Sequence, residues 1–225
     1  DAVLRELALV HTSLDDAVAT LLAWAKERDH GNTTGYALGW GAVITNVFMR
    51  RGPEVVAATR RALPVCEGLA TPMWFNYARI FQGWGLAQQS EFDDGLSEIN
   101  AGIAALKSIG NRRWFSLIYG LKAEAHALAA QRDESDAALA EAFNYLEETG
   151  DVACAGPLHC LAGQIKLTSD PAAARASYER ARGIARSQGS KAIELRAAIG
   201  LARLLRDRGK AGEARALLAP IYGWF

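Results

Sequence analysis

The sequence predicts an all-α fold, a right-handed superhelical solenoid built from stacked pairs of antiparallel helices. Three observations predict this class. Small and large residues recur together about every forty residues. Glycines and capping residues divide the chain into segments of helical length, and no segment has the alternation of apolar and polar residues that indicates a strand. Stacked helix pairs of this kind form one continuous domain.

The repeat is defined by four sets of positions. The anchor positions are Gly83, Ala123, Ala162 and Ala202. The turn positions are Ser90, Ala130, Ser169 and Gly209. The facing positions, which are small, are Gly95, Ser135, Ala174 and Ala214, and the gap-filling positions, which are large, are Ile99, Leu139, Tyr178 and Leu218. A small side chain lets two helices approach closely, and a large one nearby fills the space beside the contact.

Helix ends support the same division. Helices are expected to stop at five glycines, because glycine adopts the left-handed conformation without a Cβ penalty: Gly52, Gly110, Gly150, Gly189 and Gly209. Helices are expected to start at Asp170-Pro171 and Thr71-Pro72, where a cap precedes proline. Ser13–Asp16 and Ser90–Asp93 resemble capping boxes.

These signals predict about 11–12 helices in a single domain over residues 1–225. The predicted ranges are 14–29, 33–51, 54–67, 73–89, 92–108, 112–131, 134–148, 152–168, 171–187, 191–208 and 211–222. Residues 4–11 are expected to add one short helix.

Composition narrows the function classes. Lysine plus arginine equals aspartate plus glutamate, at 25 each, so no net field attracts nucleic acid or an anionic membrane. Cys66, Cys154 and Cys160 form no CxxC pair, which is typical of buried cysteines in a reducing compartment. No signal peptide opens the chain, and no uncharged run is long enough to span a bilayer. We therefore expect a cytoplasmic protein.

Four stretches carry a resemblance to a known family. They are LDDAVATLLAWAKE, GWGLAQQSEFDDGLSEINAGIAALKSIG, LKAEAHALAAQRDESDAALAEAFNYLEETGD and LRAAIGLARLLRDRGKAGEARALLAPIYGWF. The small and large spacing resembles the tetratricopeptide repeat (TPR), whose usual length is about 34 residues. The stretches resemble the C-terminal TPR-like region of bacterial multidomain proteins that join a class III adenylate or guanylate cyclase domain, or a DNA-binding domain, to a predicted signalling ATPase.

The resemblance implies a non-catalytic regulatory tail on a signalling enzyme. It implies that this chain is a fragment of a longer polypeptide whose catalytic residues lie in other domains. Ser90 and Ser169 depart from the family by replacing turn glycines, and the family's continuation after the last aromatic run is missing. The C-terminal apolar residues are then expected to pack back on the last helix pair or to form a homodimer: Ile221, Tyr222, Trp224 and Phe225.

No pattern of catalytic or cofactor-binding residues is present. Gly209-Lys210 lacks the serine or threonine and the upstream glycine of a phosphate-binding loop. The GWG triplets 39–41 and 83–85 are expected to be close helix contacts around a tryptophan. No two histidines have the i, i+4 spacing of a zinc site, His126 is expected to lie in the core, and His159 beside Cys160 is only a weak metal signal. The prediction is no enzyme, no cofactor and no metal.

A solenoid binds through the concave surface formed by the first helix of each pair. Residues next to the packing positions are the candidates: Asn46, Arg50, Tyr77, Trp84, Glu124, His159, Lys166, Arg196 and Arg203. Each could instead be a solvated residue or, for Trp84, a core aromatic. Tryptophan, tyrosine and arginine dominate interface energetics, so the set is expected to bind a protein or peptide.

Two function classes remain. The first is a protein-interaction scaffold that binds a partner, or another domain of the same polypeptide, and so regulates a cyclase or ATPase. The alternative is a small-molecule-sensing domain of a transcriptional activator. A peptide groove is expected to be open and mixed in charge, whereas a metabolite site is a closed pocket with convergent polar groups.

Overall fold

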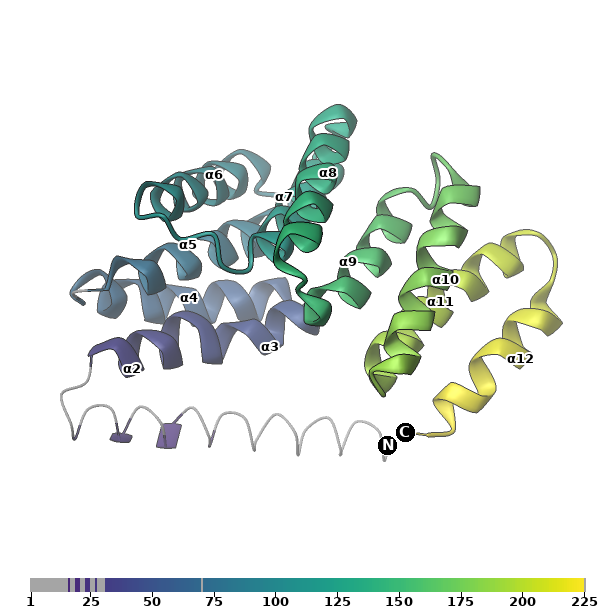
Figure 1. The fold of residues 1–225 in the computed structure, drawn as a ribbon, viewed down its shortest axis with the longest axis horizontal. Coiled ribbons are helices and arrows are strands. Elements are labelled where there is room, and N and C mark those ends of the chain that lie inside the picture. Colours follow the sequence, from purple (N-terminus) through teal and green to yellow (C-terminus); the bar gives the residue numbers. More distant parts are fainter. Residues whose placement is uncertain are drawn as a thin grey trace. The chain divides into compact units, whose positions relative to one another are not determined.

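The computed structural model describes residues 16, 19, 20, 23, 24, 27, 31–69 and 71–224, and every element in this part of the chain is a helix (Figure 1). The helices in order are α2 (Gly31–Tyr36), the π-helical η1 (Ala37–Gly41), α3 (Ala42–Phe48), α4 (Gly52–Glu67), α5 (Pro72–Ala87), α6 (Phe92–Ser108), α7 (Phe115–Leu128), α8 (Arg132–Thr149), α9 (Val152–Ile165), α10 (Pro171–Ser187), α11 (Lys191–Asp207) and α12 (Ala211–Tyr222). The predicted all-α class is confirmed.

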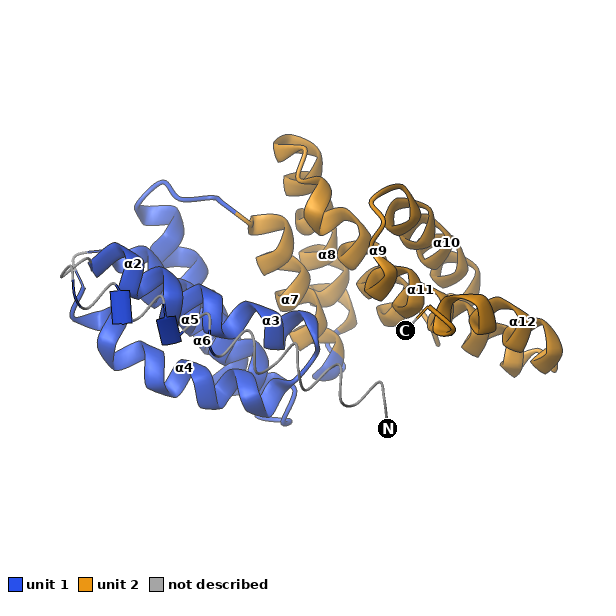
Figure 2. Ribbon diagram, turned by 90° about the horizontal axis from the view of Figure 1, so that it is seen from below, with its two compact units in different colours: residues 1–113, 128–131 blue, residues 114–127, 132–225 orange. Residues whose placement is uncertain are grey.

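The chain divides into two compact units (Figure 2). Unit 1 comprises residues 1–113 and 128–131, and unit 2 comprises residues 114–127 and 132–225. Within unit 1, α5 packs on both α4 and α6. Within unit 2, α8 packs on α9, α9 on α10, α10 on α11, and α11 on α12. None of the described helices is both long enough and apolar enough to cross a bilayer.

The predicted helix ranges match closely from residue 52 onward. Each range from 54–67 to 211–222 has an observed helix whose bounds differ by at most three residues. The predicted range 33–51 is one helical run from Gly31 to Phe48 whose middle is the π-helical segment η1. The ranges 4–11 and 14–29 fall outside the continuously described residues, and so does the predicted capping box Ser13–Asp16.

The anchor and facing positions mark the crossing point of two paired helices. A Cβ on Gly83 of α5 would collide with the Gly95 carbonyl oxygen of α6, and a Cβ on Gly95 would lie 2.6 Å from the Gly83 carbonyl oxygen. At the next copy the Ser135 hydroxyl donates to the Ala123 carbonyl at 2.8 Å, which joins α8 to α7. All eight anchor and facing residues are buried. The predicted close approach of paired helices is therefore confirmed in the first two copies.

Left-handed residues end the helices, as predicted for most of the glycines. Gly110, Gly150, Gly189 and Gly209 have φ between 62° and 76°. The prediction of a helix end at Gly52 is wrong, because Gly52 is the first residue of α4. The left-handed residue is Arg50, two positions earlier, with φ 62°. The φ of the non-glycine turn residues Ser90 and Ala130 is also positive, at 69° and 60°.

Helix starts agree with the sequence in part. The Asp170 carboxylate accepts hydrogen bonds from the amides of Ala172 and Ala173 at 3.2 and 2.9 Å, and Pro171 opens α10 as predicted. Pro72 opens α5, but the Thr71 side chain makes no capping hydrogen bond. The capping box at Ser90–Asp93 is wrong, because Ser90 is the left-handed turn residue and Glu91 is the cap.

An aromatic cluster forms the core of unit 1. Trp40 packs edge-on against Tyr77 with ring centroids 5.3 Å apart, and it lies 5.3 Å from Phe81. Trp74 packs 5.9 Å from Tyr77 and donates its indole hydrogen to Asn32 at 2.7 Å. Aromatic rings bury large areas and satisfy their polar atoms at the edge of the core. The cluster therefore joins α5 to the first helical run.

In unit 2 the packing depends on rings set against glycines. The Tyr178 ring of α10 occupies the space that side chains on Gly163 of α9 and Gly200 of α11 would fill. Phe115 packs edge-on against Tyr145 at 5.1 Å and joins α7 to α8. Because the glycines admit the Tyr178 ring, α10 contacts both α9 and α11.

We predict that Gly83→Ala destabilises the protein by about 1–3 kcal/mol, because the added methyl overpacks the α5–α6 crossing. Gly183 in α10 has open space where a Cβ would lie. Gly183→Ala is the matched control and is expected to stabilise by about 1 kcal/mol, the helix-propensity difference. Urea unfolding monitored by circular dichroism measures both. Equal stabilisation by the two variants would contradict the close crossing.

A second prediction concerns the turn positions. Ala130→Gly and Ser90→Gly should each stabilise the protein by about 1 kcal/mol, because a left-handed backbone costs a non-glycine residue about that much. Ser169 occupies the same repeat position without a positive φ, so Ser169→Gly should give no gain and serves as the control. The midpoint of urea unfolding reports each change, and a gain at Ser169 as large as at Ala130 would refute the explanation.

Candidate functional site

Two of the predicted concave-face residues belong to the core of unit 1. Tyr77 and Trp84 are both 0% exposed, so a partner cannot reach them. The Tyr77 hydroxyl donates to Asn111 or to the Arg113 carbonyl, each at 3.1 Å, and burial raises the pKa of Tyr77 to about 12. These assignments need correction because α5 is covered on two sides by α4 and α6. The alternative prediction for Trp84, that it is a core aromatic residue, is confirmed.

Asn46 and Arg50 also pack locally. Asn46 is 8% exposed, and its side-chain amide donates to the Ala42 carbonyl one turn earlier at 3.4 Å. The Arg50 guanidinium lies over the Trp84 ring, 4.7 Å from the centroid. This cation–π contact stabilises the turn after α3. The structure therefore gives both residues roles in packing within unit 1.

In unit 2, Glu124 is buried and His159 is half-buried. Glu124 is 3% exposed, which removes it from any open surface. The His159 ring packs 4.9 Å from the Phe143 ring. Burial, and secondarily the positive charge of Arg180, lowers the pKa of His159, so the imidazole is neutral at pH 7. His159 is a packing residue between α8 and α9.

The remaining three predicted residues retain some access to solvent. Lys166 caps the end of α9 and is half-buried. Arg196 is also half-buried, and burial lowers its pKa. Arg203 is exposed and lines an apolar groove described below. Arg203 therefore contributes to a surface hollow of unit 2.

The cysteines and histidines form no metal site in the part of the chain that the structure describes. All three cysteines are buried and free, as predicted. His126 is 8% exposed, in agreement with its predicted core position. The Asp151 carboxylate caps α9 by accepting from the Ala153 and Cys154 amides at 3.1 and 3.4 Å, and it accepts from the Ser116 hydroxyl at 3.3 Å. These contacts are structural.

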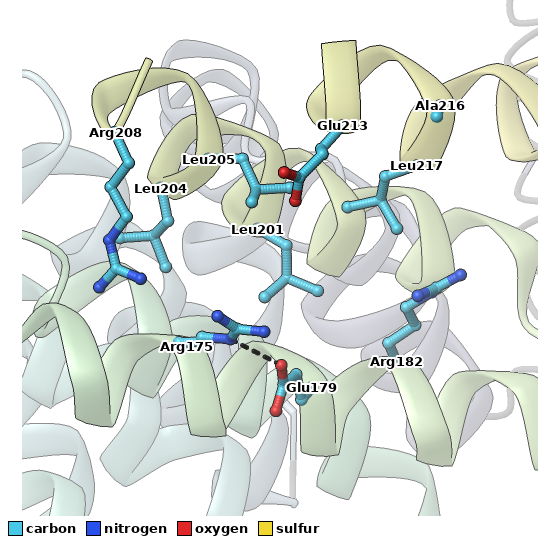
Figure 3. Close-up of a pocket in the computed structure, with 10 residues that line it drawn as sticks. All are labelled: Arg175, Glu179, Arg182, Leu201, Leu204, Leu205, Arg208, Glu213, Ala216 and Leu217. Atoms are coloured by element: carbon cyan, nitrogen blue, oxygen red, sulfur yellow. Dashed lines mark hydrogen bonds and ion pairs between the residues drawn. The ribbon is translucent and has the colours of Figure 1, made fainter. Parts of the chain in front are cut away.

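A hollow of about 460 Å³ lies between α10 and α12 and is floored by leucines of α11 (Figure 3). Leu201 and Leu204 are 7% and 8% exposed and belong to the core cluster with Tyr178, whereas Leu205 and Leu217 are half-buried. The close-up shows the leucines pointing into the space between the helices. The hollow, called here the leucine hollow, therefore presents an apolar floor that water contacts.

The rim of the leucine hollow carries charges of both signs. Arg175 and Glu179 pair at 2.8 Å with side chains 52% and 53% exposed. Glu213 is 59% exposed and pairs with Lys210 at 2.8 Å. Arg182 and Arg208 complete the rim. Because Arg175, Glu179 and Glu213 are each more than half exposed, the hollow is open to solvent.

A buried carboxylate holds the start of α11 against α10. Glu194 is 3% exposed and pairs with Lys191 at 2.8 Å and with Arg186 at 3.2 Å. The hydrogen bond from Lys191, followed by the charges of Lys191, Arg186 and Arg182, lowers the pKa of Glu194. A buried carboxylate is stable only when such partners compensate its desolvation. The carboxylate thus fixes the start of α11 against the end of α10.

A second hollow of about 700 Å³ lies along α11 and α12 and is called here the end groove. Its apolar residues include Leu195, Ile199 and Leu218. Among the residues predicted to pack back or to dimerise, Ile221 is 4% exposed and does pack back. Tyr222 and Trp224 do not, because they are 61% and 63% exposed, and Phe225 lies outside the described residues. The homodimer stays a prediction.

Sequence reasoning missed both hollows. The leucines of α11 read as core residues, and two of them do pack in the core. The arginines of α10 and α12 gave no signal, because charged residues spaced along a helix are typical of a solvated face. One signal was available: the repeat predicts a buried Leu218, whereas the structure leaves it half-buried in the lining of the end groove.

These observations define an all-α protein of packed helix pairs with two open hollows in unit 2. No protein-family model matches the chain, and no curated protein matches it in sequence. Among solved structures it is similar to the crystal structure of BtubC (BKLC) from P. vanneervenii, with a TM-score of 0.64 and 13% identity. The match covers 94% of this chain and 87% of that chain. At this identity the likeness concerns the fold alone.

We predict that the protein loses stability as the pH rises from about 9 to 11. Burial raises the pKa of Cys160 to about 11, and burial together with the Asp151 carboxylate raises that of Cys154 to about 12. Thiols in the unfolded chain ionise near pH 8.5. The native state therefore binds more protons than the unfolded state in this window, so unfolding becomes easier as pH rises. Urea unfolding at pH 8 and pH 10.5 measures the loss.

The double variant Cys154→Ala and Cys160→Ala is the control for this prediction. Its stability should fall less steeply over the same pH range, because two of the titrating groups are gone. The native protein should also resist alkylation by iodoacetamide at pH 8 until it is unfolded. An equally steep fall in the variant would show that the buried thiols are not responsible.

Proposed function

We propose that the chain is a non-catalytic protein-interaction scaffold that binds a peptide or helix of a partner protein in the leucine hollow. The observation that carries the proposal is the combination of a leucine floor with an exposed rim of arginines and glutamates. Burial of leucine side chains by a bound peptide supplies free energy, at about 25 cal/mol per Å² of apolar area. The charged rim selects the register of the peptide, since rim charges affect specificity more than affinity.

The openness of the leucine hollow favours a peptide over a metabolite. A metabolite site is an enclosed pocket with a few convergent polar groups. Here the rim residues Arg175, Glu179 and Glu213 are each more than half exposed and lie around an apolar floor. A peptide can lie along such a floor while its polar backbone remains in water. The alternative of a small-molecule-sensing domain of a transcriptional activator becomes an outcome of the test below.

Two further parts of the proposal concern architecture and context. We propose that the helix pairs form a right-handed superhelical solenoid of the TPR type, because the anchor and facing positions recur with the same burial in four successive copies. We also propose that the scaffold is a regulatory tail of a cytoplasmic signalling protein with a cyclase or ATPase domain, on the resemblance of its sequence stretches. Reading the parent coding sequence tests this second part. A parent without a cyclase, ATPase or DNA-binding domain would refute it.

The test uses peptides selected on the wild-type chain from a phage-displayed library of random 16-residue peptides. The binding proposal predicts that these peptides bind variants of the leucine hollow more weakly than the wild type. Leu205→Glu and Leu217→Glu place a charge on the apolar floor, and each should weaken binding about tenfold, which corresponds to about 1.4 kcal/mol. Fluorescence anisotropy with labelled peptides measures the dissociation constants. Circular dichroism checks that the variants keep their helix content.

The matched control is Val152→Glu. Val152 is 71% exposed, lies in unit 2 and is the first residue of α9, where an acidic side chain is tolerated by the helix dipole. This variant should bind the selected peptides as the wild type does. If the library yields no binder, or if the binders are insensitive to both leucine substitutions, the leucine hollow is not a peptide site. A metabolite screen by thermal shift then tests the alternative.

A further inference from the structure

The gap-filling residue of the last helix pair is less buried than its counterparts. Ile99, Leu139 and Tyr178 are 0%, 4% and 4% exposed, whereas Leu218 is only half-buried. In unit 2 the Tyr178 ring is covered by α11, whose Gly200 lies against it. Among the described residues nothing takes the corresponding place beside Leu218. The face of α11 and α12 around Leu218 therefore corresponds to the face of α9 and α10 around Tyr178, which α11 covers.

The end groove is this same face. Its floor includes two anchor and facing residues, Ala202 and Ala214, together with the gap-filling Leu218. At its sides Ile199 is 38% exposed and Tyr222 is 61% exposed. Small residues flanked by large apolar ones form the groove into which the ridge of a helix fits. A volume of about 700 Å³ is enough for a row of side chains from one helix face.

The charges around the end groove are of one sign. Arg203, Arg206 and Arg215 line it, and its described lining contains no carboxylate. Arg206 pairs with its neighbour Asp207 at 2.9 Å. Neither Arg203 nor Arg215 forms an ion pair with another residue that the structure describes. The arginines flank the apolar floor from both helices, so an occupant meets positive charge on both of its sides.

We propose that the end groove binds an amphipathic helix of a separate protein, one with an apolar stripe flanked by glutamates or aspartates. The apolar stripe covers Leu218 and Ile199 as α11 covers Tyr178, and the acidic flanks pair with Arg203 and Arg215. Arginine and carboxylate form paired hydrogen bonds that fix orientation as well as charge. The proposal rests on the scaffold function and assigns to it a second site and a partner chemistry.

A second copy of this chain fits the groove poorly. Two-fold pairing of the end grooves would bring the arginines of both copies together, and like charges across an interface oppose association. The strongly acidic helix α8 also cannot serve as the occupant from another copy. Its apolar residues Leu139 and Tyr145 are 4% and 8% exposed, so they are already used within unit 2.

The test uses a dye-labelled synthetic peptide that copies α11 and carries Gly200→Ala, Lys191→Glu, Arg196→Glu, Arg203→Glu and Arg206→Glu. The alanine replaces the glycine that admits Tyr178, since Leu218 is smaller, and the glutamates supply the acidic flanks. A companion peptide keeps the native lysine and arginines. Fluorescence anisotropy with the full 225-residue chain at low and moderate salt gives the dissociation constants.

The protein variant Arg203→Glu with Arg215→Glu should bind the acidic peptide at least tenfold more weakly and should bind the companion peptide better than the wild type does. Leu218→Glu should abolish binding of both. The control is Arg175→Glu with Arg208→Glu, which makes the same charge change at the leucine hollow and should leave binding of the acidic peptide unchanged. Peptides selected by phage display for the leucine hollow should bind the Arg175→Glu, Arg208→Glu variant more weakly. They should bind the Arg203→Glu, Arg215→Glu variant as they bind the wild type.

Three outcomes would overturn the proposal. One is no binding of the acidic peptide to the wild type, and another is binding that the Arg203→Glu, Arg215→Glu variant leaves unchanged. The third is a wild-type dimer in light scattering that Leu218→Glu converts to monomer, because a second copy would then occupy the groove. If the peptides selected for the leucine hollow still bind in any of these cases, the scaffold function stands without the end groove.

Discussion

The close approach of two paired helices at the anchor and facing positions is the constraint on which the rest of the structure depends. At Gly83 and Gly95 the backbones come so near that neither residue has room for a Cβ. One copy later the contact is made by the Ser135 hydroxyl on the Ala123 carbonyl. A side chain as large as valine at any of these positions would separate the helices and open voids beside them, which costs packing energy.

Because the crossing is tight, the residues around it are forced into fixed roles. The gap-filling side chain of Tyr178 extends beyond its own helix pair. Its ring packs across Gly163 of α9 and against Gly200 of the next helix, α11. A contact inside one pair is therefore converted into a contact with the following helix. The left-handed turn residues have a related role, since Ser90 and Ala130 reverse the chain within a few residues and keep the paired helices aligned.

The sequence was sufficient for the helices because these constraints are local and repeat. These signals are visible within single copies of the repeat. They are small residues at fixed spacing, positive-φ glycines such as Gly150 and Gly189, and the cap at Asp170. The candidate site was not predictable in the same way. A residue one step from a packing position faces about 100° away from it on a helix, and whether that direction is solvent or core depends on neighbours that the local pattern does not specify. Tyr77 and Trp84 of α5 are buried because α5 has helices on two sides.

The same dependence on neighbours explains why open apolar surface lies on the α11–α12 helix pair. Tyr178 is covered by the following helix α11, whereas Leu218 has no such cover among the described residues and lines an open apolar groove. Such a face would promote self-association if it were uncharged, since apolar patches of this kind mark interaction sites. In our proposal Arg203 and Arg215 change that outcome, because their charges would repel a second identical face and attract an acidic one. A surface that the repeat leaves apolar would then become selective through two residues that the repeat does not require.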